Sequence, residues 1–206
     1  MENNIDDLLK VYWSSRTDFF QKELDELLDS EQASLWLAHI VSYISNKQAR
    51  ILDAGCANGF IAFLLHSAGF NNITGMDYCE DMILKAKENA VQRGSNIEFM
   101  EGNLETTGFP DDHFDVIVCR NVLWQLSNPH IVLNEVYRIL KAEGVFIYFD
   151  ANRSELSKDN PSEKLSALAK MLPSLQSERP QWDLSLLNES GFKSVDVNNN
   201  IQDLKD

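Results

Sequence analysis

The sequence predicts an α/β domain built on a doubly wound, mostly parallel sheet with helices on both faces. From residue 50 onward, short apolar segments alternate with longer amphipathic ones, and this alternation indicates repeated strand–helix units. The strand candidates at residues 116–119 and 145–149 are apolar at every position, which is typical of strands that are buried on both faces. A length of 206 residues fits one domain with a full hydrophobic core.

Residues 1 to about 48 are expected to be helical and to precede the sheet. Leu24, Leu27 and Leu28 form one apolar stripe, and a second stripe runs from Trp36 to Ile44 at the 3.6-residue period of a helix. We therefore divide the chain into an N-terminal helical segment, residues 1–48, and an α/β domain, residues 49–206.

The α/β domain is predicted to alternate six strands with four helices. The strands are expected at residues 50–53, 73–77, 97–101, 116–119, 145–149 and 194–197, and the helices at residues 60–68, 80–93, 129–141 and 182–190. Four glycines each follow one of these helices, as expected of residues that end a helix in the left-handed conformation: Gly69, Gly94, Gly144 and Gly191.

Residues 152–180 interrupt this alternation with a short helical pattern that ends at Pro173 and Pro180. A segment that follows the carboxyl end of a strand lies over the ligand crevice in doubly wound folds, so this one is a candidate lid. The alternative is a surface connection that packs on the edge of the sheet. The sequence leaves both interpretations open.

The composition narrows the classes of partner. A formal charge of −14 opposes binding to a phosphate backbone or an anionic membrane, and the 18 Lys and Arg residues are scattered. We therefore expect no nucleic-acid partner. No apolar run reaches the roughly 18–20 residues of a membrane span, and the acidic N-terminus is unlike a signal peptide, so we expect no membrane partner.

The cysteines and histidines indicate neither a disulfide framework nor a metal site. Cys56, Cys79 and Cys119 are odd in number and include no CxxC pair, so a cytoplasmic location is the default expectation. The four histidines have no metal-ligand spacing and favour structural or solvated roles: His39, His66, His113 and His130. We expect no metal.

The most informative segment is ILDAGCANG at residues 51–59, followed by an aspartate at position 77. Gly55 and Gly59 bracket a tight turn between a buried strand and a helix, and such a turn lets the backbone approach a ligand closely. Asp77 ends the next strand, where a carboxylate is placed to accept hydrogen bonds from a ribose diol. Together they indicate a site for a nucleoside-bearing cofactor.

Further segments in the same order strengthen this interpretation. ILDAGCANG resembles the first motif of the class I S-adenosylmethionine-dependent methyltransferases, and GMDYCEDMILKAKENA resembles their second strand and the helix after it. EGNLETTGFPDDHFDVIVCRNVLWQL and NEVYRILKAEGVFIY resemble the stretch through the fourth strand to the fifth. The resemblance covers roughly residues 11–197. It implies a Rossmann-like fold, S-adenosylmethionine as cofactor with S-adenosylhomocysteine as product, and a small-molecule acceptor, as in members with an FDVIV-type fourth strand.

Carried over position by position, the resemblance implies roles around the methionine part and the ribose. Asp53 orders the glycine loop and reaches the amino group of the methionine part, directly or through water, or alternatively only caps the turn. The backbone around the amino acid and the ribose is contributed by Gly55, Cys56, Ala57 and Gly59. Asp77 accepts from both ribose hydroxyls. Arg120 borders the methionine end, or alternatively forms a salt bridge with a nearby acid.

The resemblance implies a second group of contacts around the adenine. Tyr78 and Met82 pack on the ribose and adenine faces, although a methionine there also suits the core. Asn103 stands where the family usually has aspartate and meets the adenine amino group through its amide oxygen, or alternatively only serves the loop. The backbone N–H of Leu104 meets a ring nitrogen.

The segment VYWSSRTDFF resembles the N-terminal lid of this family. Tyr12, Trp13 and Arg16 are expected either to close over the positively charged sulfur, which favours an aromatic face, or to anchor the first helix to the core. Trp124 and Gln125, just beyond the fourth strand, are expected to border the acceptor site.

Two features depart from the family pattern. The usual middle glycine of the first motif is Ala57, whose methyl group adds strain of about 1 kcal/mol if the residue has a positive φ. The family sheet also ends with a seventh, antiparallel strand between the fifth and sixth, and IQDLKD at residues 201–206 is too polar and short to supply it. Either the chain is truncated, or a neighbour completes the edge of the sheet, or the fold lacks its final antiparallel strand. An exposed edge of this kind favours a homodimer.

The sequence favours a methyltransferase but does not elect a catalytic residue. In-line transfer from a sulfonium proceeds largely by proximity, and a general base is needed only when the acceptor must lose a proton. Asp150, Glu155 and His130 are candidate bases, and nothing in their spacing chooses among them. One alternative is a catalytically silent cofactor-binding module. A nicotinamide-dependent oxidoreductase is less favoured, because the G-x-G-x-x-G spacing is absent.

Overall fold

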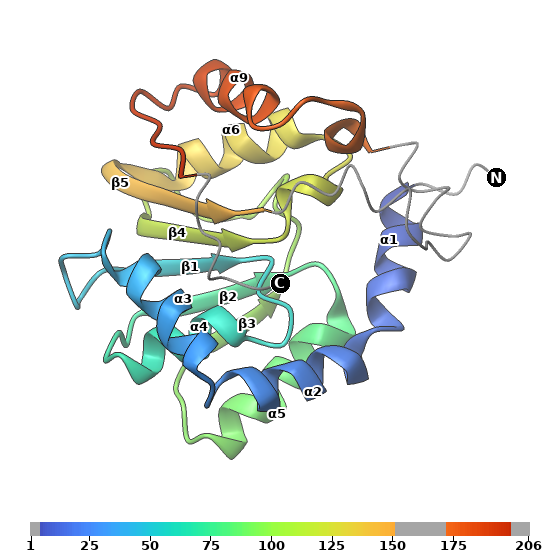
Figure 1. Cartoon of the computed structure of the whole chain (residues 1–206), viewed down its shortest axis with the longest axis vertical. Helices are drawn as coiled ribbons and strands as arrows, with labels where there is room; N and C mark the ends of the chain where they lie inside the picture. The colour runs from blue at the N-terminus through green and yellow to red at the C-terminus, as the bar shows by residue number, and fades with distance from the viewer. Residues whose placement is uncertain (1–4, 151–171, 199–206) are drawn as a thin grey trace.

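Five parallel strands form one sheet in the order β3-β2-β1-β4-β5. The computed structural model describes residues 5–150 and 172–198. The strands are β1 (Ile51–Ala54), β2 (Ile73–Asp77), β3 (Glu98–Glu101), β4 (Phe114–Arg120) and β5 (Leu140–Phe149). In Figure 1 all five arrowheads point toward the side of the molecule where the first helix stands. The predicted doubly wound α/β fold is confirmed.

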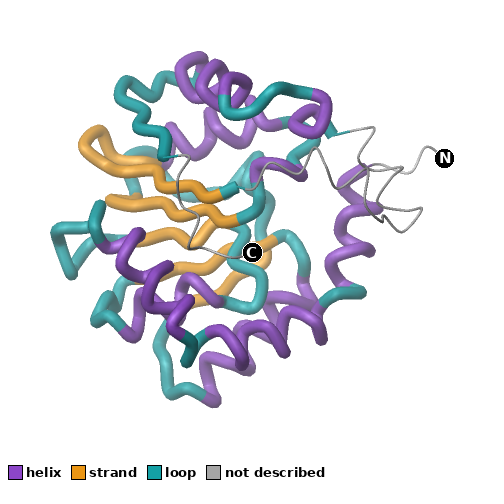
Figure 2. The backbone as a smooth tube through the Cα atoms, viewed as in Figure 1, coloured by secondary structure: helices purple, strands orange, loops and turns teal. Residues whose placement is uncertain are grey.

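Helices cover both faces of this sheet (Figure 2). They are α1 (Ile5–Ser14), α2 (Thr17–Leu27), α3 (Glu31–Val41), α4 (Phe60–Ser67), α5 (Glu80–Gln92), α6 (Pro129–Ile139) and α9 (Gln181–Glu189), with short 3-10 helices η1 (Leu123–Gln125) and η3 (Pro173–Gln176). One apolar core joins α3, α4 and α5 to one face of the sheet, and a second core joins α6 to the other face. Helix α9 packs outside α6.

Most predicted helix ends agree with the structure. Gly69, Gly94 and Gly191 follow α4, α5 and α9 with φ of 87°, 61° and 101°, as expected of left-handed glycines at helix ends. The prediction for Gly144 is wrong, because α6 ends at Ile139 and the chain enters β5 directly. Gly144 lies inside β5, where an added Cβ would come within 2.8 Å of the Leu140 side chain.

The predicted sixth strand at residues 194–197 does not form; this part of the chain follows α9 without regular structure. A sixth strand in this fold pairs with an antiparallel strand that separates it from the fifth, and the residues that the structure describes contain no such strand. With no neighbour to accept its backbone hydrogen bonds, an alternating segment such as Ser194–Val195–Asp196–Val197 has no reason to become extended.

The excursion expected at residues 152–180 lies mostly outside the described residues, and only its end is described. Leu172 is buried against Leu9 of α1 and Trp124 of η1. The hydroxyl of Ser174 in η3 donates to the backbone oxygen of Trp124. The end of the excursion therefore packs beside the first helix and the loop after β4.

Strand register brings the loops that follow the strands to one edge of the sheet. Ala54 lies opposite both Met76 and Cys119, and Asp77 lies opposite Glu101. Helix α1 stands at the same edge, where the Lys10 ammonium donates to Glu101 at 2.7 Å. Loops from four strands and the N-terminal helices thus meet at one place.

Candidate functional site

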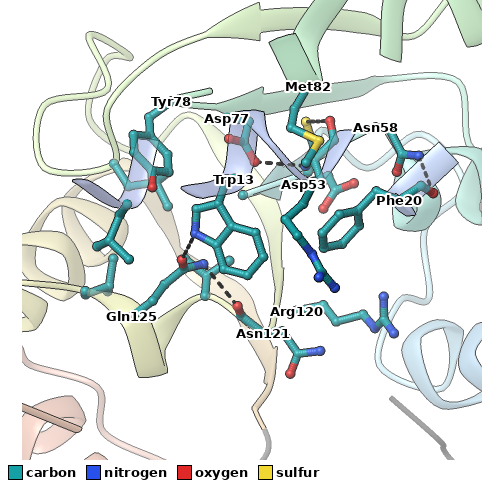
Figure 3. A pocket seen from close by; sticks show the side chains of 18 of the residues that line it. Trp13, Phe20, Asp53, Asn58, Asp77, Tyr78, Met82, Arg120, Asn121 and Gln125 are labelled. Carbon is teal, nitrogen blue, oxygen red and sulfur yellow. Dashed lines mark hydrogen bonds between the residues drawn. The ribbon is translucent and has the colours of Figure 1, made fainter. Parts of the chain in front are cut away.

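A cavity of about 480 Å³ lies at the carboxyl ends of the strands, between the loops after β1 to β4 and the helices α1 and α2 (Figure 3). Pockets of this volume hold ligands the size of a nucleoside cofactor. Ten of the eleven residues predicted for cofactor binding line it: Asp53, Gly55, Cys56, Ala57, Asp77, Tyr78, Met82, Asn103, Leu104 and Arg120. The sequence pattern and the cavity therefore coincide.

Gly59 is the predicted residue that the lining does not include. It precedes α4 with φ of 99°, and a Cβ there would approach Phe63 at 2.7 Å and Phe99 at 2.8 Å. Its requirement for glycine comes from this turn and this packing. Gly55 has φ of 74°, and a Cβ on it would meet Val122 at 2.3 Å, so the turn lies directly against the loop after β4.

The carboxylate of Asp77 joins two loops of the site. One oxygen accepts from the backbone N–H of Ala57 and the other from that of Cys79, both at 2.9 Å. Burial raises the pKa of Asp77, and the backbone hydrogen bonds oppose this increase. Each oxygen keeps a second lone pair, so the carboxylate can still accept hydrogen bonds from a ligand.

Asp53 is buried at the end of β1, where one of its oxygens accepts from the backbone N–H of Ala62 at 3.0 Å. This bond satisfies a free donor in the first turn of α4, so the capping role that the sequence left open is present. Burial raises the pKa of Asp53 to about 7, and the charge of Arg120 opposes this increase. Arg120 and Asp53 therefore belong to the same end of the cavity.

Ala57 has φ of 46°, the left-handed conformation that disfavours a side chain. The sequence predicts strain if this residue has a positive φ, and the structure confirms the conformation. Its N–H is the one that binds Asp77 at 2.9 Å. The turn therefore keeps its hydrogen bond in spite of the methyl group.

The loop after β3 forms the other end of the cavity. The Asn103 side-chain oxygen accepts from the backbone N–H of Glu105 at 2.8 Å, and its backbone oxygen accepts from Thr106 at 3.0 Å, so Asn103 shapes a tight turn. Met82 is almost fully buried. The hydroxyl of Tyr78 is buried and has no hydrogen-bond partner among the described residues.

The N-terminal helices close one side of the cavity. Tyr12, Trp13 and Arg16, which the sequence placed in a lid, all line it. The indole N–H of Trp13 donates to the side-chain oxygen of Gln125, and Figure 3 shows Trp13 between Gln125 and Asp77. Trp13 also lies edge-on to Trp124, with ring centroids 6.2 Å apart.

Asn58, at 2% exposure, is a site residue that the sequence reasoning did not identify. Its side-chain N–H donates to the backbone oxygen of Phe20 at 2.7 Å and so attaches α2 to the glycine turn. An amide within an otherwise small-residue turn is a signal that could have revealed this contact. Phe20 of α2, which also lines the cavity, lies in the lid-like segment VYWSSRTDFF but was not singled out, and Glu23 was missed because no local motif includes it.

The cavity wall is acidic and aromatic. It contains five carboxylates, Asp6, Glu23, Asp53, Asp77 and Glu105, and two guanidinium groups, Arg16 and Arg120. Excess negative charge and aromatic faces both favour a ligand with positive charge. The described lining includes no histidine or lysine. Of the three candidate bases, His130 and Asp150 lie outside this lining, and Glu155 lies outside the described residues.

Comparison with known proteins decides the family. The profile of the family described as "Methyltransferase domain" matches residues 45–193. The chain belongs to this methyltransferase-domain family. Within the part of the chain that is described, no helix is long and apolar enough to cross a membrane, and no group of three metal-ligating side chains occurs.

Relatives of this methyltransferase domain share moderate identity over part of their length. An uncharacterized methyltransferase of Bacillus subtilis, YcgJ, is 35% identical over 102 residues, which cover 49% of this chain and 40% of the relative. A ubiquinone biosynthesis O-methyltransferase of Actinobacillus pleuropneumoniae is 27% identical over 110 residues, covering 51% and 47%. The chain thus spans about half the length of the curated relatives that it matches.

A solved structure has the same fold as this methyltransferase domain. An S-adenosylmethionine-dependent methyltransferase from Aquifex aeolicus superposes with a TM-score of 0.61 at 21% identity, covering 82% of this chain and 87% of that one. The methyltransferase family implies S-adenosylmethionine as the cofactor. The cavity fits it: a buried strand-end carboxylate suits the ribose, acidic and aromatic walls suit a sulfonium, and Arg120 suits a carboxylate.

Proposed function

We propose that this protein transfers a methyl group from S-adenosylmethionine to a small-molecule acceptor. The observation that carries the proposal is the convergence of ten predicted cofactor residues on one cavity, with Asp77 buried where β2 ends. The O-methyltransferase named among its relatives supports a small acceptor, as does the size of the cavity. The acidic chain supports the absence of a nucleic-acid substrate.

The residues of the chain would act mainly by binding and orientation. Asp77 would accept from the ribose hydroxyls, Asp53 and Arg120 would hold the amino and carboxylate groups of the methionine part, and Asn103 and Leu104 would meet the adenine. S-adenosylmethionine, when bound, supplies an activated methyl group and leaves as a neutral thioether. Fixing the acceptor in line with that methyl group provides up to about 7–11 kcal/mol of barrier reduction.

The N-terminal residues 1–48 would serve as a lid, and residues 49–206 would bind the cofactor. This assignment is supported by the position of α1 and α2 along one side of the cavity and by the Trp13–Gln125 hydrogen bond. Closing that side would exclude water from the reacting groups. A cytoplasmic location remains the expectation from the cysteine pattern.

Calorimetry with S-adenosylhomocysteine and S-adenosylmethionine tests the cofactor half of the proposal. We expect saturable binding of both, with loss of affinity in Asp77→Asn. Release of S-adenosylhomocysteine in the presence of a panel of metabolites tests the transfer half. Absence of detectable binding at millimolar concentration would contradict the proposal.

The left-handed conformation of Ala57 favours one alternative, a catalytically silent module that retains the fold. Such a module would bind the cofactor weakly or not at all and would release no methyl group with any acceptor. A nicotinamide-dependent oxidoreductase would instead be stabilised in a melting assay by NAD and not by S-adenosylmethionine.

A further inference from the structure

Two opposite charges in the cavity wall lack ionic partners. Arg16 and Glu23 both line the cavity, and neither forms an ion pair or a side-chain hydrogen bond with the residues that the structure describes. The Nε atom of Arg16 is buried without an acceptor. Charges that are half buried and unpaired are costly unless a ligand compensates them.

Helix α2, which carries Glu23 and directly follows Arg16, is held firmly in place. Asn58 donates to the backbone oxygen of Phe20 at 2.7 Å, and Asn89 of α5 donates to the side chain of Gln21 at 3.0 Å. The guanidinium of Arg16 lies over the ring of Phe19, 4.2 Å from its centroid, which restricts its orientation. Both charges are therefore presented from a fixed wall.

In the proposed function, a different pair of charges would hold the cofactor. Asp53 and Arg120 belong to the wall formed by β1 and β4, and they suffice for the amino and carboxylate groups of the methionine part. Arg16 and Glu23 lie on the facing wall, which is formed by the N-terminal helices. When the amino and carboxylate groups of the cofactor's methionine part are paired with Asp53 and Arg120, Arg16 and Glu23 remain as a second pair of opposite charges.

The N-terminal helices also carry an aromatic cluster that lines the same cavity. The rings of Trp13 and Phe20 meet edge-on with centroids 5.8 Å apart, and those of Tyr12 and Trp13 with centroids 4.9 Å apart. Aromatic faces beside a carboxylate bind an ammonium group, and an arginine binds a carboxylate. The wall formed by the N-terminal helices therefore offers two opposite charges together with aromatic faces that an apolar group can contact.

We propose that the methyl acceptor is a small zwitterion, an amino acid in the broad sense, whose carboxylate binds Arg16 and whose amino group binds Glu23. This inference rests on the proposed function, because it assigns the acceptor of the same cavity. The net charge of −14 does not by itself select such a molecule, since it would favour any cation. The arginine adds the requirement for a carboxylate.

Ligand-observed NMR with the full chain, saturated with S-adenosylhomocysteine, tests the proposal. The probes are amino acids with short, branched and aromatic side chains and with the amino group at different distances from the carboxylate. Each is compared with its amide, which lacks the carboxylate, and its N-acetyl derivative, which lacks the cationic amine. We expect at least one zwitterion to bind about tenfold more tightly than both derivatives, and Arg16→Gln and Glu23→Gln to abolish that preference.

The matched control is the pair Lys22 and Glu26 on the same helix, which are exposed at 78% and 66% and pair with each other. Lys22→Gln and Glu26→Gln should leave zwitterion binding unchanged. We also expect Arg16→Gln and Glu23→Gln to keep their affinity for S-adenosylhomocysteine within about twofold. Such a result would assign both residues to the acceptor site and not to the cofactor site.

Four results would overturn the proposal. If the singly charged derivatives bind as well as the zwitterions, the acceptor is not recognised as a zwitterion. If Arg16→Gln weakens S-adenosylhomocysteine instead, the arginine belongs to the cofactor. If S-adenosylhomocysteine does not bind the unaltered chain, the proposed function fails first and this assignment falls with it; if it binds while every zwitterion fails, only the acceptor assignment fails.

Discussion

The carboxylate of Asp77 stabilises the loops of the site in addition to its proposed role in binding the ribose. It holds the turn after β1 and the turn after β2 together through the N–H groups of Ala57 and Cys79. A strand-end acid in this position therefore fixes the relative position of two loops before any ligand arrives. Affinity and loop geometry depend on the same two oxygens.

Asp77→Ala should therefore weaken both stability and cofactor binding. Removing the acceptors leaves two N–H groups without partners, at about 1–3 kcal/mol each where they are buried. Asp77→Asn retains one acceptor oxygen and should cost less stability. Both variants should bind S-adenosylhomocysteine about tenfold or more weakly by calorimetry, because a charge-assisted contact is lost. Unchanged affinity in Asp77→Ala would refute the ribose assignment.

Ala57→Gly should stabilise the protein. Its φ of 46° costs about 1–2 kcal/mol for an alanine, and the greater flexibility of the unfolded glycine returns part of that gain. We expect a net increase of about 0.5–1 kcal/mol in the free energy of unfolding, measured by denaturant titration. Ala54→Gly, in buried β1, is the control and should destabilise. A loss of stability in both variants would show that the methyl group of Ala57 packs favourably.

At the scale of elements, a carboxylate on α6 fixes the loop after β3. One Glu135 oxygen accepts from the Thr107 backbone N–H at 2.9 Å and from its hydroxyl at 2.6 Å. Arg138, one turn along the helix, binds Glu135 at 2.8 Å and also donates to the backbone oxygen of Phe109 at 2.8 Å. Helix α6 thus holds the loop that carries Asn103 and Leu104.

Glu135→Gln should loosen this loop and reduce sensitivity to acid. Hydrogen bonds from Arg138 and Thr107 lower the pKa of Glu135 to about 2, against an ordinary value of 4.5. Its stabilising contribution is therefore complete above pH 4.5 and is lost as the pH falls toward 2. The variant should lose about 1–3 kcal/mol at neutral pH and show a smaller further loss on acidification.

Amide hydrogen exchange at Thr107 provides the local measurement for this variant, and exchange there should accelerate. Glu88→Gln removes an exposed partner of Lys85 and is the control, with no expected change. If Thr107 exchanges at the same rate in Glu135→Gln, the loop is held by other contacts.

Local patterns predicted the elements that have their own periodicity or their own stop signal. The apolar strands from Ile51, Ile73 and Val116 and the glycine stops at Gly69 and Gly94 carry their information in a few adjacent residues. A strand at residues 194–197 would need a partner strand elsewhere in the chain, so the alternating pattern of this segment alone wrongly predicted a strand. The prediction that Gly144 ends a helix was wrong because a glycine can occur either at a helix end or in a strand where a neighbouring side chain leaves no room for a Cβ.

Local patterns also predicted only part of the candidate site. The motif after β1 and the acid after β2 revealed the sheet side of the cavity, because loops after parallel strands must meet at one edge. The contacts of Asn58 with Phe20 and of Trp13 with Gln125 join segments far apart in the chain. No local pattern contains such pairings, so the facing wall was expected only in outline.

At the scale of the whole molecule, β5 pairs only with β4 among residues 5–150 and 172–198. An open sheet edge offers unpaired backbone groups to another chain, so we predict a homodimer that forms through β5. Light scattering after size exclusion should show a mass that rises toward twice the monomer's with concentration. A monomer at every concentration up to about 100 μM, far above a typical dimer dissociation constant, would contradict this edge as an interface.

The buried acids predict how stability depends on pH. Burial raises the pKa values of Asp53 and Asp150 to about 7, and it raises that of Asp77 as well. Asp53 and Asp150 therefore hold protons in the folded protein between about pH 4 and pH 7, where the unfolded chain has lost them, so their contribution to stability falls as the pH rises through this range. Asp77 contributes in the same direction. The melting temperature should therefore decrease between pH 5 and pH 8. In Asp53→Asn the decrease in melting temperature should be smaller by the contribution of one titrating carboxyl group. The asparagine side-chain oxygen still accepts the hydrogen bond from the Ala62 N–H, but the amide does not ionise. Parallel melting curves for the two proteins across this range would show that Asp53 is already ionised in the folded state, and the buried charge would then need a closer partner than Arg120.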